Sequence, residues 1–122
     1  MNTPSQTETE LAQQVVGEQL SGVTFVMDYL QLQFNPPPMI NAYTPVTVRS
    51  AIGSCISGED QFRNRLCEQI TKIVKSLVIR GEEAFLITFQ DGSEISISLK
   101  PADYTGPEAL EFHGRDNLWM VI

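Results

Sequence analysis

Residues 71–99, TKIVKSLVIRGEEAFLITFQDGSEISISL, decide the fold class. Apolar residues occupy every second position in two of its stretches, 85–89 and 95–99, a period typical of half-buried strands. The residues that share a face are Phe85, Ile87 and Phe89 in one stretch and Ile95, Ile97 and Leu99 in the next. Asp91-Gly92 between alternating stretches is a strong hairpin signal. The spacing predicts a three-stranded antiparallel meander over 71–80, 84–90 and 93–99.

A helix is predicted directly before this meander. Phe62, Leu66 and Ile70 recur at helical spacing, and Ser57 with Asp60 three positions later resembles a capping arrangement. Small, polar residues over 50–57 lead into it.

The two cysteines, Cys55 and Cys67, have neither CxxC spacing nor a nearby histidine in the sequence. The spacing therefore indicates neither a disulfide framework nor a zinc site. We expect both to be buried structural thiols.

The N-terminal half is predicted to contain the same kinds of element, a helix followed by strands, with a proline-rich segment between the strands. We expect a flexible lead-in over 1–7, a short helix that starts at Thr7 or Thr9 and stops at Gly17, and a strand pair over 23–34. Three consecutive prolines exclude a central strand from 35–45 because they remove ladder donors. An extended loop or an edge segment is expected there, followed by a short strand over 46–49.

The C-terminal tail gives weaker signals. Pro107 suits the first position of a helix, so one short helical turn is expected around 107–111. Residues 113–116 read as a loop, and 118–122 as a final strand that is apolar on both faces.

Together these elements predict a single α+β domain over 1–122. Two main helices would lie on one face of a largely antiparallel sheet of about six or seven strands. The run Glu18-Gln19-Leu20-Ser21 also matches Glu68-Gln69-Ile70-Thr71 at an offset of fifty. This suggests a duplicated helix–hairpin unit over 8–49 and 57–99, with chance similarity of two amphipathic units as the alternative.

The charge balance excludes several classes of partner. Eight Lys and Arg residues against fifteen Asp and Glu residues give a net charge of −7, which disfavours binding to nucleic acid or to anionic membrane. No apolar run approaches the ~20 residues of a spanning helix, and the N-terminus lacks signal-peptide features. We therefore expect a cytoplasmic protein.

The acidity is concentrated in the first half of the chain. Residues 1–61 hold six acidic groups and one basic group, and the first 48 residues hold no Lys or Arg. Such a face can steer a basic protein partner; ordinary solubility is the alternative explanation.

No catalytic or nucleotide-binding fingerprint is present. His113 is the single histidine, and acid–base schemes at neutral pH usually need one. Tyr104, His113, Arg115 and Asp116 are the candidate binding residues. We predict no catalytic residue, no metal ligand and no cofactor.

The hairpin over 84–99 followed by Asp103 to Ala109, DYTGPEA, resembles small uncharacterised bacterial α+β domains. Some of these are similar to immunity proteins, which neutralise a cognate toxin by binding it. The resemblance implies no catalytic residues. The sequence thus favours a non-enzymatic protein-interaction domain. The alternatives are a small-molecule binder or enzyme with a pocket near Tyr104, His113 and Arg115, and a homodimer that pairs through a sheet edge or the C-terminal strand.

Overall fold

The computed structural model describes residues 6–122, which form two α-helices and ten β-strands. The elements are α1 (Gln6–Val15), β1 (Gly22–Val26), β2 (Tyr29–Gln33), β3 (Met39–Ala42), β4 (Val46–Ser50), β5 (Gly53–Ile56), α2 (Phe62–Cys67), β6 (Val74–Arg80), β7 (Ala84–Phe89), β8 (Glu94–Ser98), the short 3-10 helix η1 (Pro101–Asp103), β9 (Leu110–His113) and β10 (Trp119–Val121). Most of the predicted lead-in over 1–7 lies outside the described residues, and Gln6 and Thr7 already belong to α1.

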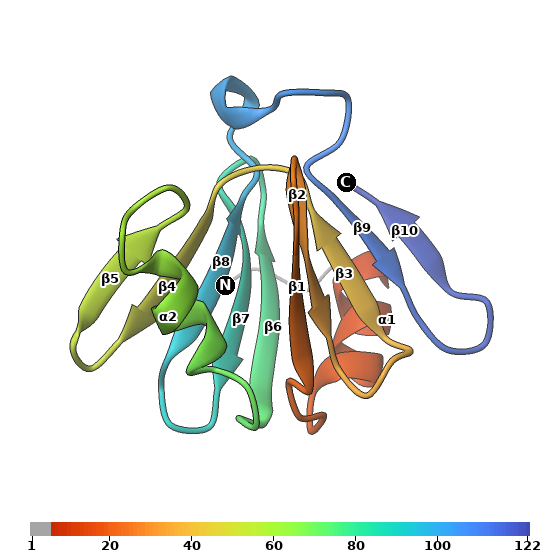
Figure 1. The fold of residues 1–122 in the computed structure, drawn as a ribbon. Coiled ribbons are helices and arrows are strands. Elements are labelled where there is room, and N and C mark those ends of the chain that lie inside the picture. Colours follow the sequence, from red (N-terminus) through yellow and green to blue (C-terminus); the bar gives the residue numbers. More distant parts are fainter. Residues whose placement is uncertain (1–5) are drawn as a thin grey trace.

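The strands form two five-stranded antiparallel sheets, in the orders β1-β2-β3-β9-β10 and β5-β4-β8-β7-β6. Figure 1 shows β1 and β6 at the facing edges of the two sheets, with α1 behind the first sheet and α2 in front of the second. The α+β class and the antiparallel pairing are confirmed. The expectation of one sheet with six or seven strands and both helices on one face is wrong, because the strands divide between two sheets.

The same order of elements occurs twice along the chain. A helix, a three-stranded meander and a hairpin appear as α1, β1–β3 and β4–β5, and again as α2, β6–β8 and β9–β10. Each hairpin pairs with the meander of the other half, since β4 pairs with β8 and β9 with β3. The two halves therefore complete each other's sheets.

The segments that enter β1 and β6 join the halves at the centre. Gln19 and Ile73 form an isolated antiparallel bridge. Leu20 donates its backbone N–H to the Lys72 carbonyl at 2.9 Å, and Thr71 donates to the Leu20 carbonyl at 2.7 Å. The first of the matched tetrapeptides thus lies along this short backbone ladder, and the second reaches it only at its last residue, Thr71.

A single core serves both sheets. The predicted meander is confirmed as β6–β8, and its alternating apolar residues are buried. The largest fully buried side chains are Phe34, Phe85, Phe89, Phe112, Leu11, Leu20, Leu32, Ile40, Leu66, Ile87, Ile95 and Ile97. They come from both halves, so neither half encloses a core alone.

Two segments predicted without strands carry them. The segment 35–45 was expected to be a loop or an edge segment, but β3 begins directly after Pro38 and pairs with both β2 and β9 as the central strand of the first sheet. The prolines precede the strand and so cost it no ladder donors. The polar stretch before α2 likewise contains β5, which pairs with β4 at one edge.

The tail also differs from its prediction. Residues 110–113 form β9 in place of a helical turn, and His113 is the last residue of that strand. Leu110 and Phe112 are buried while Glu111 and His113 face outward, and this alternation fits pairing with β3. The pairing outweighs the local helix signal of Pro107. The final strand is confirmed as β10.

The cap predicted for the second helix is wrong. The residue that precedes α2 is Gln61, and it makes no side-chain capping bond. The Ser57 hydroxyl instead accepts a hydrogen bond from the Val46 N–H at 2.8 Å, which ties the loop to β4.

The expected burial of both thiols is also not observed, because Cys67 is exposed and Cys55 half-buried, although both are free.

Candidate functional site

The residues proposed from the tail do not form one constellation. Tyr104 packs partly buried against the core after η1. Asp116 is exposed, with a φ of 57°, in the turn between β9 and β10. Within residues 6–122, no hydrogen bond or ion pair joins any two of Tyr104, His113, Arg115 and Asp116.

Arg115 fastens α1 to the β9–β10 hairpin. Its Nη2 donates to the Gln14 carbonyl at 2.9 Å, and its Nη1 donates to the Pro37 carbonyl at 3.4 Å. The Gln14 side chain in turn accepts from the Arg115 N–H at 2.6 Å and donates to the Arg115 carbonyl at 3.0 Å. The guanidinium thus satisfies a carbonyl at the end of the helix, which has no partner within the helix.

His113 belongs to a row of side chains on the outer face of the first sheet. Its Nε2 lies 3.6 Å from Glu111 Oε2, and its ring centroid is 6.4 Å from that of Trp119. Glu111 also accepts a hydrogen bond from the Tyr43 hydroxyl. Burial, followed by this bond and the Glu111 charge, raises the pKa of Tyr43 to about 12.

Asn41 occupies the middle of the same face. Its pairing register places it between Gln31 on β2 and Glu111 on β9. Asn41 is 8% exposed, and its Oδ1 is buried without a hydrogen-bond partner among the described residues. An unsatisfied buried acceptor of this kind costs about 1–3 kcal/mol.

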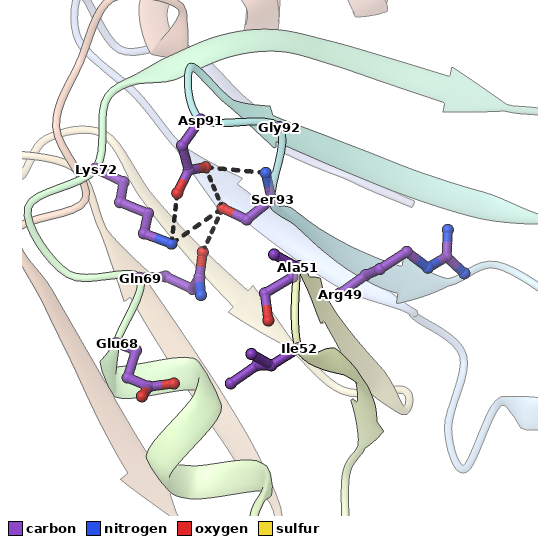
Figure 2. Close-up of a pocket in the computed structure, with 10 residues that line it drawn as sticks. Arg49, Ala51, Ile52, Glu68, Gln69, Lys72, Asp91, Gly92 and Ser93 are labelled. Carbon is purple, nitrogen blue, oxygen red and sulfur yellow. Dashed lines mark hydrogen bonds and ion pairs between the residues drawn. The ribbon is translucent and has the colours of Figure 1, made fainter.

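A cavity of about 570 Å³ lies where the β4–β5 turn, the end of α2 and the β7–β8 turn meet (Figure 2). Its polar wall is a network of four side chains. The Lys72 ammonium is 2.8 Å from Asp91 Oδ2 and donates to Ser93 Oγ at 3.2 Å. Ser93 Oγ lies 2.6 Å from Asp91 Oδ1 and 2.7 Å from Gln69 Oε1.

The electrostatics of this network do not favour catalysis. Hydrogen bonds from Lys72 and from Ser93 lower the pKa of Asp91 to about 2. A carboxylate with so low a pKa is a weak base for activating the Ser93 hydroxyl at neutral pH. The other charged side chains at the cavity are also paired: Arg49 with Glu94 at 3.4 Å, and Glu68 with Arg65 at 3.1 Å. The arrangement fits a structural clamp between the β7–β8 turn and the segment before β6.

Sequence reasoning treated Asp91 as a turn residue and did not single out Lys72, Gln69 or Ser93. Asp-Gly-Ser signals a turn in which the aspartate bonds its own backbone two residues on, and Ser93 N–H does donate to Asp91 Oδ1 at 2.9 Å. The lysine comes from another element, so no sequence spacing indicates it.

The β1–β2 turn carries an exposed apolar surface, which we call the hairpin-tip patch and define as Phe25, Val26 and Met27. These side chains are 41%, 39% and 95% exposed. Arg63 of α2 lies over the Phe25 ring, with its guanidinium carbon 5.9 Å from the ring centroid. A side chain as exposed as Met27 gains nothing from the core, so the fold does not explain it.

A second cavity, of about 290 Å³, adjoins the patch. Its walls come from residues 25–30, 42–45, 57–58 and 62–63. Within it, the rings of Tyr29 and Tyr43 pack with centroids 5.4 Å apart at a tilt of 54°. The walls therefore combine the β1–β2 hairpin, the β3–β4 connection and α2.

Other kinds of site find no support within residues 6–122. No group of three or more His, Cys, Asp or Glu side chains there is placed to hold a metal ion. No helix there is both long and apolar enough to cross a membrane. Comparisons with protein-family models, curated proteins and solved structures find no match to this chain. The resemblance of the Asp103–Ala109 segment therefore stays a prediction.

Proposed function

We propose that this chain is a non-enzymatic protein-interaction domain that binds its partner through the hairpin-tip patch. The observation that carries the proposal is the exposure of Phe25, Val26 and Met27 beside a cavity lined by aromatic rings. Aromatic residues, Met and Arg are enriched in protein interfaces, and a few of them usually supply most of the binding energy. Arg63 over Phe25 completes this composition.

Capture from an extract of the native cells, with the purified chain as bait, tests this proposal. Met27→Ser removes the most exposed apolar side chain of the patch. Ile52→Ser is the matched control, because Ile52 is likewise an exposed apolar residue, at 67%, but lines the other cavity. We expect a protein that is captured by the wild type and by Ile52→Ser but lost with Met27→Ser. Capture that is equal for both variants, or no capture at low salt, contradicts the proposal.

An immunity-type role is the specific form of this function that the Asp103–Ala109 resemblance favours. Its partner would be a toxin whose gene lies beside the gene for this chain. In this form the protein would act in the cytoplasm, where free thiols such as those of Cys55 and Cys67 persist. Absence of a neighbouring toxin gene would count against this form while leaving the interaction domain intact.

Two further proposals concern the architecture. A duplicated unit over 8–49 and 57–99 is supported by the repeated order of helix and meander. A homodimer through β10 is supported by the exposure of Trp119 and Val121, 55% and 39%, on a strand at a sheet edge. Light scattering that returns a monomer mass would exclude the dimer.

A small-molecule site near Tyr104, His113 and Arg115 remains the alternative function. Trp119, beside His113, provides the readout, because a bound ligand would change its fluorescence. A library titration that leaves the emission unchanged would argue against it.

A further inference from the structure

The cavity beside the hairpin-tip patch has the size and lining to take one apolar side chain. Its volume of about 290 Å³ falls at the lower limit of small-molecule pockets, roughly 300–1,000 Å³. Its lining includes Leu30 and Phe62, which are 7% and 5% exposed, and the Tyr29–Tyr43 pair. The apolar part of this lining gains most from burying an aliphatic or aromatic group.

The surroundings of this cavity are acidic. Asp28 lies in the wall at the β1–β2 turn, and Glu59 and Asp60 directly follow the wall residue Gly58. Next to the wall residue Tyr43, Glu111 accepts a hydrogen bond from the Tyr43 hydroxyl, and the negative charge of Glu108 contributes to the raised pKa of Tyr43.

Positive charge at this cavity is scarce. Arg63 is the one basic residue among the wall residues, and it lies over the Phe25 ring. In the part of the chain that the structure describes, neither Asp28 nor Asp60 forms an ion pair with another side chain. Asp28 in the wall and Asp60, close in sequence to the wall residue Gly58, therefore carry negative charge that no ion pair among the described residues offsets.

We infer that the partner of this surface is a basic protein segment that inserts one apolar side chain into the cavity and sets a flanking Lys or Arg against Asp28 and Asp60. The inference rests on the proposed function and adds the chemistry of the partner. A flexible, exposed Met27 can adapt to the inserted group, while the acidic border raises the association rate for a basic segment.

The charge argues against the other occupants of an exposed apolar patch. A second copy of this chain carries the same −7 charge, so the two acidic borders would repel each other. Anionic lipid surfaces and nucleic acids are disfavoured by the same repulsion.

Fluorescence anisotropy with three labelled peptides tests the inference on the full chain. The first probe has one Phe flanked by two Lys on each side, the second has Glu in place of every Lys, and the third has Ala in place of Phe. We expect the Lys–Phe peptide to bind at least about tenfold more tightly than either comparison peptide, since loss of an anchor or of charge complementarity each removes more than 1.4 kcal/mol.

Variants locate the binding. Met27→Ser should weaken the Lys–Phe peptide about tenfold. The double variant Asp28→Asn, Asp60→Asn should weaken it about fivefold and reduce its dependence on salt. Ile52→Ser, at the other cavity, should leave the dissociation constant unchanged.

The outcomes separate this inference from the proposed function. Equal binding of the Glu–Phe and Lys–Phe peptides, lost with Met27→Ser, would keep the interaction surface and overturn a basic partner. Equal binding of the Lys–Ala peptide would overturn the apolar anchor. If no peptide binds, the inference is wrong. Capture of a partner from cell extract then still tests, independently, whether the chain is an interaction domain.

Discussion

Replacing Asp91 by asparagine isolates the charge of the clamp at the β7–β8 turn. Asparagine keeps an oxygen that can accept from the Ser93 N–H but removes the carboxylate that faces the Lys72 ammonium 2.8 Å away. Asparagine before Gly92 is also favourable in a hairpin turn. The change in the free energy of unfolding should therefore report the charged interaction and little else.

Its magnitude follows from the pKa of Asp91, which is lowered from 3.8 to about 2 in the folded protein. A shift of this size corresponds to at most ~2.4 kcal/mol. The Asp91 side chain is 50% exposed, and solvent screening of such an exposed pair reduces the contribution to about 1 kcal/mol. We expect Asp91→Asn to lower the free energy of unfolding by about 1 kcal/mol at pH 7.

The dependence on pH has a fixed sign. Because folding lowers the pKa of Asp91, its contribution is complete above the unfolded value of 3.8 and is lost as the pH falls through the folded value of about 2. The difference between wild type and variant should be constant from pH 5 to 7 and about half as large at pH 3.

Urea unfolding followed by circular dichroism at pH 7, 5 and 3 measures this difference. Asp116→Asn is the matched control, because Asp116 lies in another exposed turn and forms no ion pair within the described chain. Its effect should stay within about 0.5 kcal/mol at every pH. A loss for Asp91→Asn that is equally large at pH 3 and pH 7, or no loss at pH 7, would refute the reasoning.

Three further predictions concern β3 of the first sheet and residues that flank its strands. Tyr43→Phe should lower the free energy of unfolding by about 1 kcal/mol at pH 7. Because folding raises the pKa of Tyr43 from 10.0 to about 12, this contribution is complete below pH 10 and is lost as the pH rises through 12. Urea unfolding of both proteins at pH 8 and pH 11 measures the difference. Asn41→Val removes the unpartnered Oδ1 and should leave stability unchanged or raise it by about 1 kcal/mol in urea unfolding; a clear loss would mean that the amide is satisfied in solution. Phe34→Ala, in the core, should cost about 3–5 kcal/mol, and a cost below 1 kcal/mol would show that the core is not shared as described.

The elements that sequence could predict are those with local signals. The meander β6–β8 is specified by alternation and by Asp91-Gly92 within one continuous stretch, and α1 by its apolar stripe and the stop at Gly17, whose φ is 89°. Each needs no partner outside its own segment. Burial of the alternating residues then follows from their period.

The elements that were missed depend on partners far along the chain. β3 and β9 pair Met39 with His113, and each is short enough that neither carries a clear pattern alone. Pro107 gave a local helix signal that the pairing overrides. The division into two sheets depends on this exchange between halves, which no single segment encodes.

The candidate sites were missed for the same reason. Arg115 was predicted to be a binding residue, and the structure places its side chain against the end of α1, 101 residues earlier in the chain. Exposure of Met27 is likewise a property of the folded surface, since the sequence placed Met27 within the predicted strand pair over 23–34, whereas β1 ends at Val26.

The exchange of hairpins between halves has a consequence for binding at the hairpin-tip patch. The cavity beside it is walled by the β1–β2 hairpin and the β3–β4 connection from the first half, and by Phe62 and Arg63 of α2 from the second. A partner seated there contacts both halves, so it binds the assembled fold and not a separated half. Mass action then raises the apparent stability of the whole domain on binding, by about 2.7 kcal/mol at a hundredfold excess over the dissociation constant. Stability of the fold and occupancy of the patch are therefore linked quantities, and a partner can be recognised by the thermal shift it produces as well as by its capture.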